Sequence, residues 1–420
     1  MKIPRYSFGF IAIISLFLLA FLVLFALSAQ TQQTVASYQK LGLPVLHIVT
    51  ENGKAIKSKE KYLDATCTLI DHDTTVSLSG KIRGRGNSTW NTFDRSKKSY
   101  LLTLPEAQPL LDLPAAQKWT LLANIVDKTS LRNVYAYHLG KTVWNRFAWV
   151  PQTRFVFVTV NNTFAGLYAL TEKVEVAPNH VAITPPQSFL AEVSTIHKEP
   201  WDFVTRQNIS FTIDKIAGRE DSAAYAPYQA YIQQVEDVLF SDTFADPTRG
   251  WRAYLDADSW VDWYLVSEFS RNNDSKFLNS CYMYYDDTQK KLFMGPLWDY
   301  DIAFGNISYN DCDKTDGWHT KRYDWYKRLF EDPAFVALVQ ERWNERRGAL
   351  EQSFDWLSAK AEQLTPAAEI NDIVWRTFGR RQWPNAPGYR QRKTYQAEIA
   401  YMRAWLTART AWIDKTGFAN

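Results

Sequence analysis

The sequence predicts an α+β fold in which a sheet-rich first half precedes a helix-rich second half. Short apolar or alternating segments, separated by turn residues, fill the region after residue 41. Beyond about Ser222, apolar residues recur at steps of three and four, which is the spacing of helices, and a single hairpin pattern interrupts them. Such a division is compatible with two lobes, and we expect the chemistry near the cleft between them.

Composition limits the classes of protein to consider. The chain has 420 residues, enough for two or three domains or one fold of two large lobes. Its 48 Lys+Arg and 45 Asp+Glu give a formal net charge of +3, so a nucleic acid polymer is not an expected partner. Hydrophobic residues at 46% and charged residues at 22% are typical of packed domains and exclude a disordered or fibrous chain for most of the length.

Cysteine and histidine usage argues against two further classes. Cys67, Cys281 and Cys312 are too few for a disulfide scaffold and allow at most one bridge within the chain. The six histidines are scattered, without the close pairing of zinc ligands, which argues against a zinc enzyme.

The N-terminus predicts export. Residues 8–29 are uncharged and strongly apolar, and residues 1–7 before them carry Lys2 and Arg5. A spanning helix needs about 20 residues and a signal-peptide core about 7 to 15, so the length favours an uncleaved membrane anchor. A cleaved signal peptide is the alternative, because small residues stand at the end of this segment. By the positive-inside rule, the polar stalk at 30–40 and the body after it lie outside the cytoplasm, on the membrane or, after cleavage, secreted.

Residues 41–180 form the expected sheet-rich lobe. A helix is expected at 129–143, because capping residues from Asp127 to Ser130 precede apolar residues at helical spacing. A hairpin with a six-residue loop, 161–166, is expected after it. The expected strands are 44–50, 65–70, 76–82, 99–104, 154–160 and 167–171.

Residues 181–420 form the expected helix-rich lobe. Its expected helices are 223–239, 258–270, much of 332–364, and 395–413, and its expected hairpin has strands 281–285 and 291–297. The aromatic residues Trp251, Trp260, Trp263 and Tyr264, and likewise Trp318, Trp325 and Tyr326, are expected to be core rather than a binding platform.

The most informative stretch is 271–306. Asp274 follows a helix, Asn279 stands five positions later, and Asp299 and Asp301 follow the hairpin. Phosphoryl transfer needs such groups: a carboxylate to orient the attacking hydroxyl, and an amide with one or two carboxylates to hold magnesium. Loop capping is the alternative for the first two residues, and a calcium site or solvated strand end is the alternative for the last two.

A second stretch is compatible with phosphate binding. Gly84 and Gly86 follow a strand, where backbone N–H groups can approach phosphates, and Lys97 and Lys98 begin the next strand. An ordinary turn and a solvated strand edge explain the same residues.

Six blocks of sequence resemble the CotH family of atypical secretory protein kinases. In order they are IRGRGNSTW, KKSYLLTL, KWTLLANIVDKTSLRN, GLYALTEKVE, the loop from Asp274 to Asn279, and GPLWDYDIAFGN. They cover residues 81–306, and WLTARTAWID near the C-terminus is similar to the family's closing segment. The resemblance implies a kinase-like bilobal fold, ATP, Mg²⁺ or Mn²⁺, and phosphoryl transfer to Ser or Thr of proteins outside the cytoplasm.

The resemblance also implies roles for individual residues. Asp274 would be the catalytic base, Asn279 with Asp301 or Asp299 would hold the metal, and Glu172 matches a family motif of unassigned role. The implied nucleotide-binding residues are Arg83, Gly84, Arg85, Gly86, Glu172, Lys97 and Lys98, the last of these also being counted as catalytic.

Departures from ordinary kinases leave two functions open. There is no full G-x-G-x-x-G, no His-Arg precedes Asp274, and the expected helix at 129–143 has no Glu to pair with the lysine, so Glu172 or Glu192 would have to replace it. These features suit either an atypical kinase or a non-catalytic surface protein that serves in structure, assembly or adhesion. Transfer of phosphate or nucleotide to a glycan or other small acceptor is a third possibility.

Overall fold

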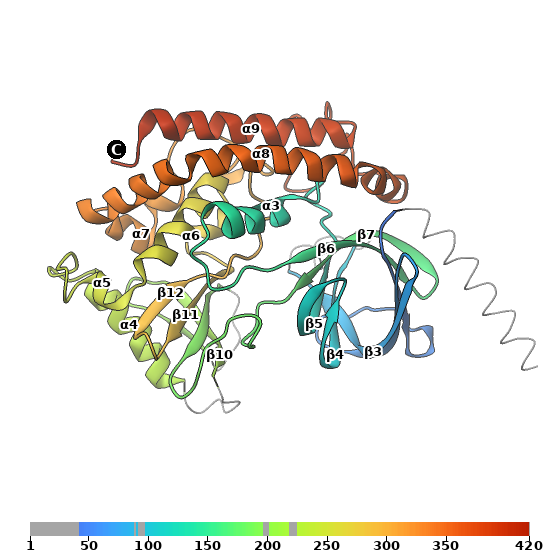
Figure 1. Cartoon of the computed structure of the whole chain (residues 1–420), viewed down its shortest axis with the longest axis horizontal. Helices are drawn as coiled ribbons and strands as arrows, with labels where there is room; N and C mark the ends of the chain where they lie inside the picture. The colour runs from blue at the N-terminus through green and yellow to red at the C-terminus, as the bar shows by residue number, and fades with distance from the viewer. Residues whose placement is uncertain (1–41, 88–89, 91–96, 196–200, 218–224, 420) are drawn as a thin grey trace, which may run out of the picture.

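The computed structural model describes residues 42–87, 90, 97–195, 201–217 and 225–419. The expected membrane segment at 8–29, with residues 1–7 and the stalk at 30–40, lies outside these described residues. Among the described helices, none combines the length and apolar character needed to cross a bilayer. The chain is a mixed α+β protein, with a barrel on one side and most of the helices on the other (Figure 1).

The first seven strands close into a barrel in the order β1-β2-β3-β4-β5-β7-β6. The strands are β1 Val45–Thr50, β2 Leu63–Asp71, β3 Thr74–Arg85, β4 Ser99–Leu110, β5 Leu113–Leu122, β6 Thr153–Val160 and β7 Thr163–Glu172. Closure comes from the parallel pairing of β1 with β6, in which Val45 lies opposite Phe157. A closed sheet leaves no free edge strand, so the barrel is protected against edge-to-edge association.

The barrel is filled by apolar side chains from alternate strand positions. Leu46, Ile82 and Trp119 are each 0% exposed. The expected six-residue loop between β6 and β7 is wrong, because only two residues, Asn161 (φ 48°) and Asn162 (φ 65°), connect the strands. Asparagine tolerates these left-handed angles, and a two-residue turn of this kind matches the twist of a hairpin. Strand β5 was not anticipated.

The helical region contains a second sheet, of order β12-β11-β8-β10-β9. The expected hairpin is confirmed as β11 Cys281–Asp286 and β12 Lys291–Met294. Three strands that the pattern did not predict extend the hairpin into this sheet: β8 Phe189–Val193, β9 Asp202–Val204 and β10 Ser210–Ile216. Strand β8 pairs with β11, β10 pairs with β8, and β9 lies at the far edge beside β10. All five residues of β8 are buried, so this strand lacks the alternation that makes a half-exposed strand recognisable.

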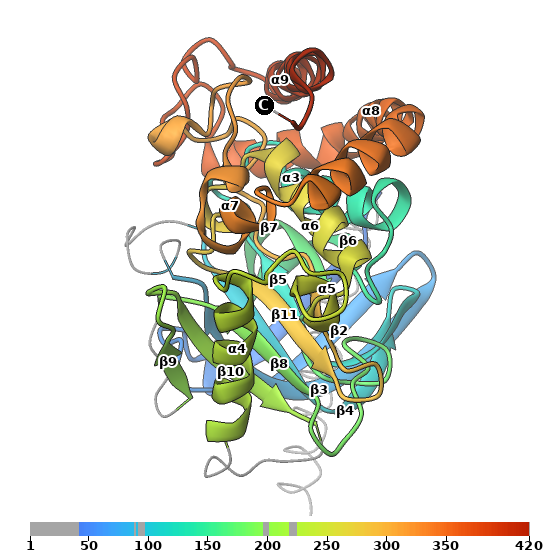
Figure 2. The ribbon, with the colours of Figure 1, turned by 90° about the vertical axis from the view of Figure 1, so that its left-hand side faces the viewer.

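Helices cover the second sheet and connect it to the barrel. They are α3 Arg132–His138, continued by a π-helical turn at Leu139–Val143, α4 Ala226–Leu239, α5 Trp251–Tyr254, α6 Ala257–Ser270, α7 Asp324–Leu329, α8 Pro333–Trp375 and α9 Tyr395–Thr416. Helices α8 and α9 lie side by side in both views (Figures 1 and 2). Each begins at a side-chain cap, Asp332 for α8 and Thr394 for α9.

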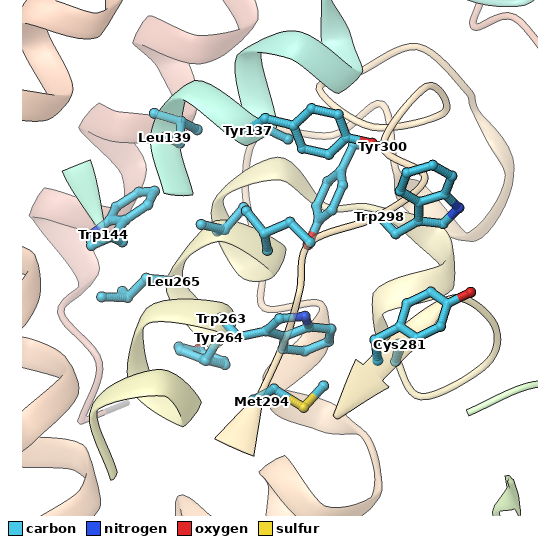
Figure 3. Close-up of a cluster of buried hydrophobic side chains, with 14 of the residues drawn as sticks. Tyr137, Leu139, Trp144, Trp263, Tyr264, Leu265, Cys281, Met294, Trp298 and Tyr300 are labelled. Carbon is cyan, nitrogen blue, oxygen red and sulfur yellow. The ribbon is translucent and has the colours of Figure 1, made fainter. Parts of the chain in front are cut away.

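The helical region has an aromatic core, as expected. Trp251, Trp260, Trp263, Tyr264 and Trp325 are each no more than 2% exposed. Figure 3 shows part of this core, where side chains from α3, α6 and the strands β11 and β12 converge. Tyr300 lies in the same cluster, and its hydroxyl is 3.0 Å from that of Ser267. The segment that carries the two aspartates is therefore attached to a rigid core.

Candidate active site

A cavity of about 240 Å³ collects residues from the barrel and from the helical region. Arg85 and Gly86 come from the end of β3, and Asn133 comes from α3. The described residues that line it also include Asp274, Asn279, Ser280, Asp299, Asp301, Tyr309, Trp383 and Pro384. Six of the residues implied by the family resemblance thus share one cavity: Arg85, Gly86, Asp274, Asn279, Asp299 and Asp301.

The loop that carries Asp274 begins where α6 ends. Arg271 takes a left-handed conformation (φ 46°) and turns the chain out of the helix. Asn273 then donates a side-chain hydrogen bond of 3.1 Å to Oδ1 of Asp274, which helps to orient the carboxylate. At the other end of the loop, Oδ1 of Asn279 accepts hydrogen bonds from the backbone N–H (2.9 Å) and the hydroxyl (2.8 Å) of Thr195.

The segment with Asp299 and Asp301 is held by α3 and by neighbouring loops. The backbone N–H of Tyr300, between the two aspartates, donates to Oδ1 of Asn133 over 2.6 Å. Arg132 is completely buried, donates to the carbonyl of Ala303 over 3.0 Å, and forms an ion pair with Asp127. Because Tyr300 points into the aromatic core, the aspartates on either side of it face the cavity.

The three carboxylates are electrostatically destabilised as anions. Burial, and next the charge of Asp299, raise the pKa of Asp274 to about 7. Burial also raises the pKa of Asp299, and burial with the charges of neighbouring aspartates raises the pKa of Asp301 well above its ordinary value. Arg85 opposes the shift at Asp299 and at Asp301. Bringing a further positive charge into the cavity would therefore be favourable.

The oxygen atoms around the cavity fit a hard divalent cation. Carboxylate and amide oxygens are the preferred ligands of Mg²⁺, and among the described residues Arg85 is the one cation that opposes the raised pKa values of the partly buried Asp299 and Asp301. Within the described ranges, no three His, Cys, Asp or Glu side chains form a group that could hold a metal ion by themselves. Mg²⁺ commonly uses only one or two carboxylates and completes its shell with water and substrate phosphates.

The two glycines of the expected phosphate loop differ in position. Gly86 lines the cavity and has a φ of 99°. Gly84 instead packs under the indole of Trp90, where a Cβ atom would lie 2.2 Å from the ring. Arg83 lies over the ring of Tyr62 at 5.1 Å, and neither Arg83 nor Gly84 is among the described residues of the cavity wall.

The two lysines are also outside the described lining of the cavity. Lys97 is 1% exposed, donates to the carbonyls of Ala123 and Leu167, and lies 4.3 Å from the ring centre of Tyr168. Burial lowers its pKa well below the ordinary value. Lys98 is half-buried and donates to the carbonyl of Trp90 over 2.7 Å. Lys98 is thus the less enclosed of the two ammonium groups.

Glu172 is buried at the end of β7, apart from the cavity lining. Its Oε2 accepts a hydrogen bond from the backbone of Gln152, and its Oε1 lies 3.7 Å from Nε2 of His180. Burial raises its pKa to about 7. These contacts tie β7 to the segment before β6. The alternative lysine partner, Glu192, lies on β8 in the second sheet.

The structure adds cavity residues that the sequence pattern did not single out. Asn133 belongs to the block SLRN, so the family resemblance offered a signal for it. Tyr309 and Trp383 stack with ring centres 6.4 Å apart and an angle of 23° between their planes. They come from segments more than seventy residues apart, and no local pattern relates them.

A comparison with protein families places these residues in context. The model of a family described as CotH kinase protein matches residues 82–413, most of the chain and all of the candidate cavity. A comparison with curated proteins finds no match. Since the match runs from the end of β3 through the Asp274 loop and the Asp299 segment into helix α9, the chain belongs to the CotH family of kinase-like proteins.

Proposed function

We propose that this protein is an ATP- and divalent-metal-dependent kinase that transfers phosphate to Ser or Thr of proteins outside the cytoplasm. One observation carries the proposal: Asp274 and Asn279 share a cavity with Asp299 and Asp301, and Arg85 comes from the barrel to the same cavity. In this reading the barrel and the helical region act as the two lobes of a kinase-like fold.

The proposed roles follow from the chemistry of phosphoryl transfer, which depends on positioning and electrostatics. Asp274 accepts the hydrogen bond of the acceptor hydroxyl and takes its proton. Its pKa of about 7 makes the carboxylate a competent acceptor near neutral pH. Arg85 and the backbone N–H groups around Gly86 face the phosphates.

Asn279, Asp299 and Asp301 would hold the cation. When bound, Mg²⁺ or Mn²⁺ neutralises phosphate charge and aligns the phosphates with the acceptor. Asn133 holds the backbone between Asp299 and Asp301 in place. The Oδ1 atom of Asn279 accepts two hydrogen bonds from Thr195, so Asn279 would exchange one of these for the cation.

We further propose that residues 8–29 anchor the protein in a membrane, with the body outside the cytoplasm. The proposal rests on the sequence pattern. Protease digestion of intact cells or spheroplasts tests it: a body that is degraded only after permeabilisation of the inner membrane would contradict it.

The intact mass of the detergent-solubilised protein, incubated with ATP and Mg²⁺ or Mn²⁺, tests the function. We expect the wild type to add phosphate to itself or to an added protein, and Asp274→Asn and Asp301→Asn to lose transfer by about a thousandfold. Asp64→Asn, at an exposed position on β2, is the matched control and should behave as the wild type. Mass steps of one nucleotide would identify nucleotidyl transfer instead.

A non-catalytic surface role is the second candidate, because neither Lys97 nor Lys98 is among the described residues that line the cavity. It predicts neither ATP binding nor transfer. Equilibrium binding of ATP with Mg²⁺ separates the two candidates, because only the kinase is expected to bind. Binding of ATP without transfer to any protein would direct the search to glycans and other small acceptors.

A further inference from the structure

We infer that the linker between α8 and α9, residues 376–393, is a docking surface for acidic segments of the acceptor protein. We call these residues the basic linker. The inference rests on the proposed function, because it assigns a substrate class to the same cavity. It is carried by the charge of the linker, by its attachment to the aspartate segment, and by the aromatic pair at the cavity.

The basic linker is strongly and uniformly positive. Between Asp372 and Glu398 the sequence has no acidic residue and six basic ones: Arg376, Arg380, Arg381, Arg390, Arg392 and Lys393. All except Arg392 are exposed. Arg392 forms an ion pair with Glu398, whereas no ion pair among the described residues involves the other five. Five exposed cations without acidic neighbours in sequence form a surface suited to a polyanionic partner.

The basic linker is attached directly to the catalytic segment. Asn385 is 6% exposed and donates hydrogen bonds to Oδ1 of Asn306 (3.0 Å) and to the carbonyl of Val126 (2.7 Å). Asn306 in turn donates to the backbone carbonyl of Asp301 over 2.7 Å. Lys128 donates to the carbonyl of Arg380 over 2.7 Å. The positive surface is therefore held at a fixed place relative to the cavity.

An aromatic pair connects the basic linker with the cavity. Trp383, from the linker, stacks on Tyr309, and the two are 44% and 37% exposed. Both line the cavity that contains Asp274. A peptide whose hydroxyl reaches Asp274 would thus pass exposed rings before it meets the arginines. This position favours a protein acceptor over a membrane surface as the occupant.

The predicted substrate class is a Ser or Thr with a run of Asp and Glu nearby in sequence. Such a segment would place its hydroxyl at Asp274 and its carboxylates on Arg380 and Arg381.

The direct test is peptide binding to the full-length protein in detergent without nucleotide, measured by fluorescence anisotropy. The probe is a labelled peptide with one Ser and a run of Glu, compared with the same peptide carrying Lys in place of Glu. We expect the acidic peptide to bind, and Arg380→Glu combined with Arg381→Glu to weaken it at least about tenfold. Binding should also weaken as salt is raised.

The matched control is Lys57→Glu combined with Lys61→Glu, two exposed lysines before β2 that produce the same change in net charge. Its affinity should stay that of the wild type. Equal binding by both double variants, equal binding of the Lys peptide, or binding only to anionic lipid vesicles would each overturn the inference.

Kinetics separate this inference from the proposed function. With ATP, the Arg380→Glu/Arg381→Glu variant should raise KM for the acidic peptide about tenfold, leave kcat unchanged, and phosphorylate a neutral Ser peptide as the wild type does. Acidic-peptide binding without transfer to any acceptor would refute the kinase assignment and retain the docking surface. Transfer with no preference for acidic peptides would retain the kinase and refute the docking surface.

Discussion

The barrel interior and the active-site cavity contain opposite kinds of side chain. The barrel encloses Trp119, Leu121 and Leu170, each 0% exposed. The cavity brings together Asp299 and Asp301 with a single arginine that opposes their shifted pKa values. The first arrangement stabilises the fold, because apolar surface leaves water. The second destabilises it, because like charges are held in a desolvated place.

The active-site cavity, unlike the barrel interior, can gain stability by binding a ligand. Because its carboxylates repel one another, binding of a cation or a metal–nucleotide complex there releases more free energy than binding in the apolar barrel would. We therefore expect substitutions in the barrel to lower stability alone, and substitutions in the cavity to change stability and activity in opposite directions.

Trp119→Ala should produce the largest change in stability. Truncation of a fully buried tryptophan leaves a cavity and costs about 3 to 5 kcal/mol. Urea denaturation followed by circular dichroism measures it. Val76→Ala, at a position 40% exposed on the same barrel, should cost less than about 0.5 kcal/mol. If the two variants unfold alike, the barrel interior does not dominate the stability of this region.

Asp274→Asn should stabilise the protein at neutral pH while it abolishes transfer. The pKa of Asp274 is about 7 in the folded protein and about 4 in an unfolded chain, so the folded state binds more protons between these values. Stability supplied by the protonated form is present below pH about 4 and declines as pH rises toward 7. The variant lacks this decline and should gain on the order of 2 kcal/mol at pH 8.

The test compares the unfolding free energies of Asp274→Asn and the wild type at pH 8 and at pH 4. The stability gained by the variant at pH 8 should vanish at pH 4. A variant that is less stable than the wild type at pH 8 would show that Asp274 makes stabilising contacts as an anion, and the contrast between cavity and barrel would then fail.

The smallest predicted effects concern Lys97 and Lys98, which should differ in their contribution to ATP affinity. Lys97→Met should leave ATP affinity unchanged, because its ammonium is enclosed by the carbonyls of Ala123 and Leu167. Lys98→Met should lower ATP affinity about tenfold, because the half-buried Lys98 is the less enclosed of the two ammonium groups and is the one proposed to contact a phosphate. Calorimetric titration with a non-hydrolysable ATP analogue measures both. The reverse order of effects would assign the phosphate contact to Lys97.

Much of the helical region was predictable, because its helices carry their own periodic patterns and caps. The strand β8 was not, since a short strand that is buried throughout has no alternation to detect. The closure of the barrel could not be predicted from the local hydrophobic pattern either. It depends on the pairing of β1 with β6, segments more than a hundred residues apart, and nothing local specifies that contact.

The candidate site divides in the same way. Asp274, Asn279, Asp299 and Asp301 lie within one short stretch, so their grouping could be proposed from spacing. Arg83 and Arg85 are two residues apart on β3, a step of about 7 Å, and so lie on the same face of the strand. Arg83 lies over the ring of Tyr62, whereas Arg85 lies over the ring of Trp298. Spacing alone could not choose between these arginines.

The amino-acid sequence was enough to predict the family, the α+β class, the order of most elements and the presence of an oxygen-rich donor set beside a hairpin. These are properties of short segments, whose patterns survive without knowledge of their neighbours. Tertiary structure alone decided that Lys97 is enclosed, that Arg85 faces the aspartates, and that Trp383 brings the basic linker to the cavity. Each of these depends on packing between segments far apart in the chain, where burial and the available partners decide the outcome.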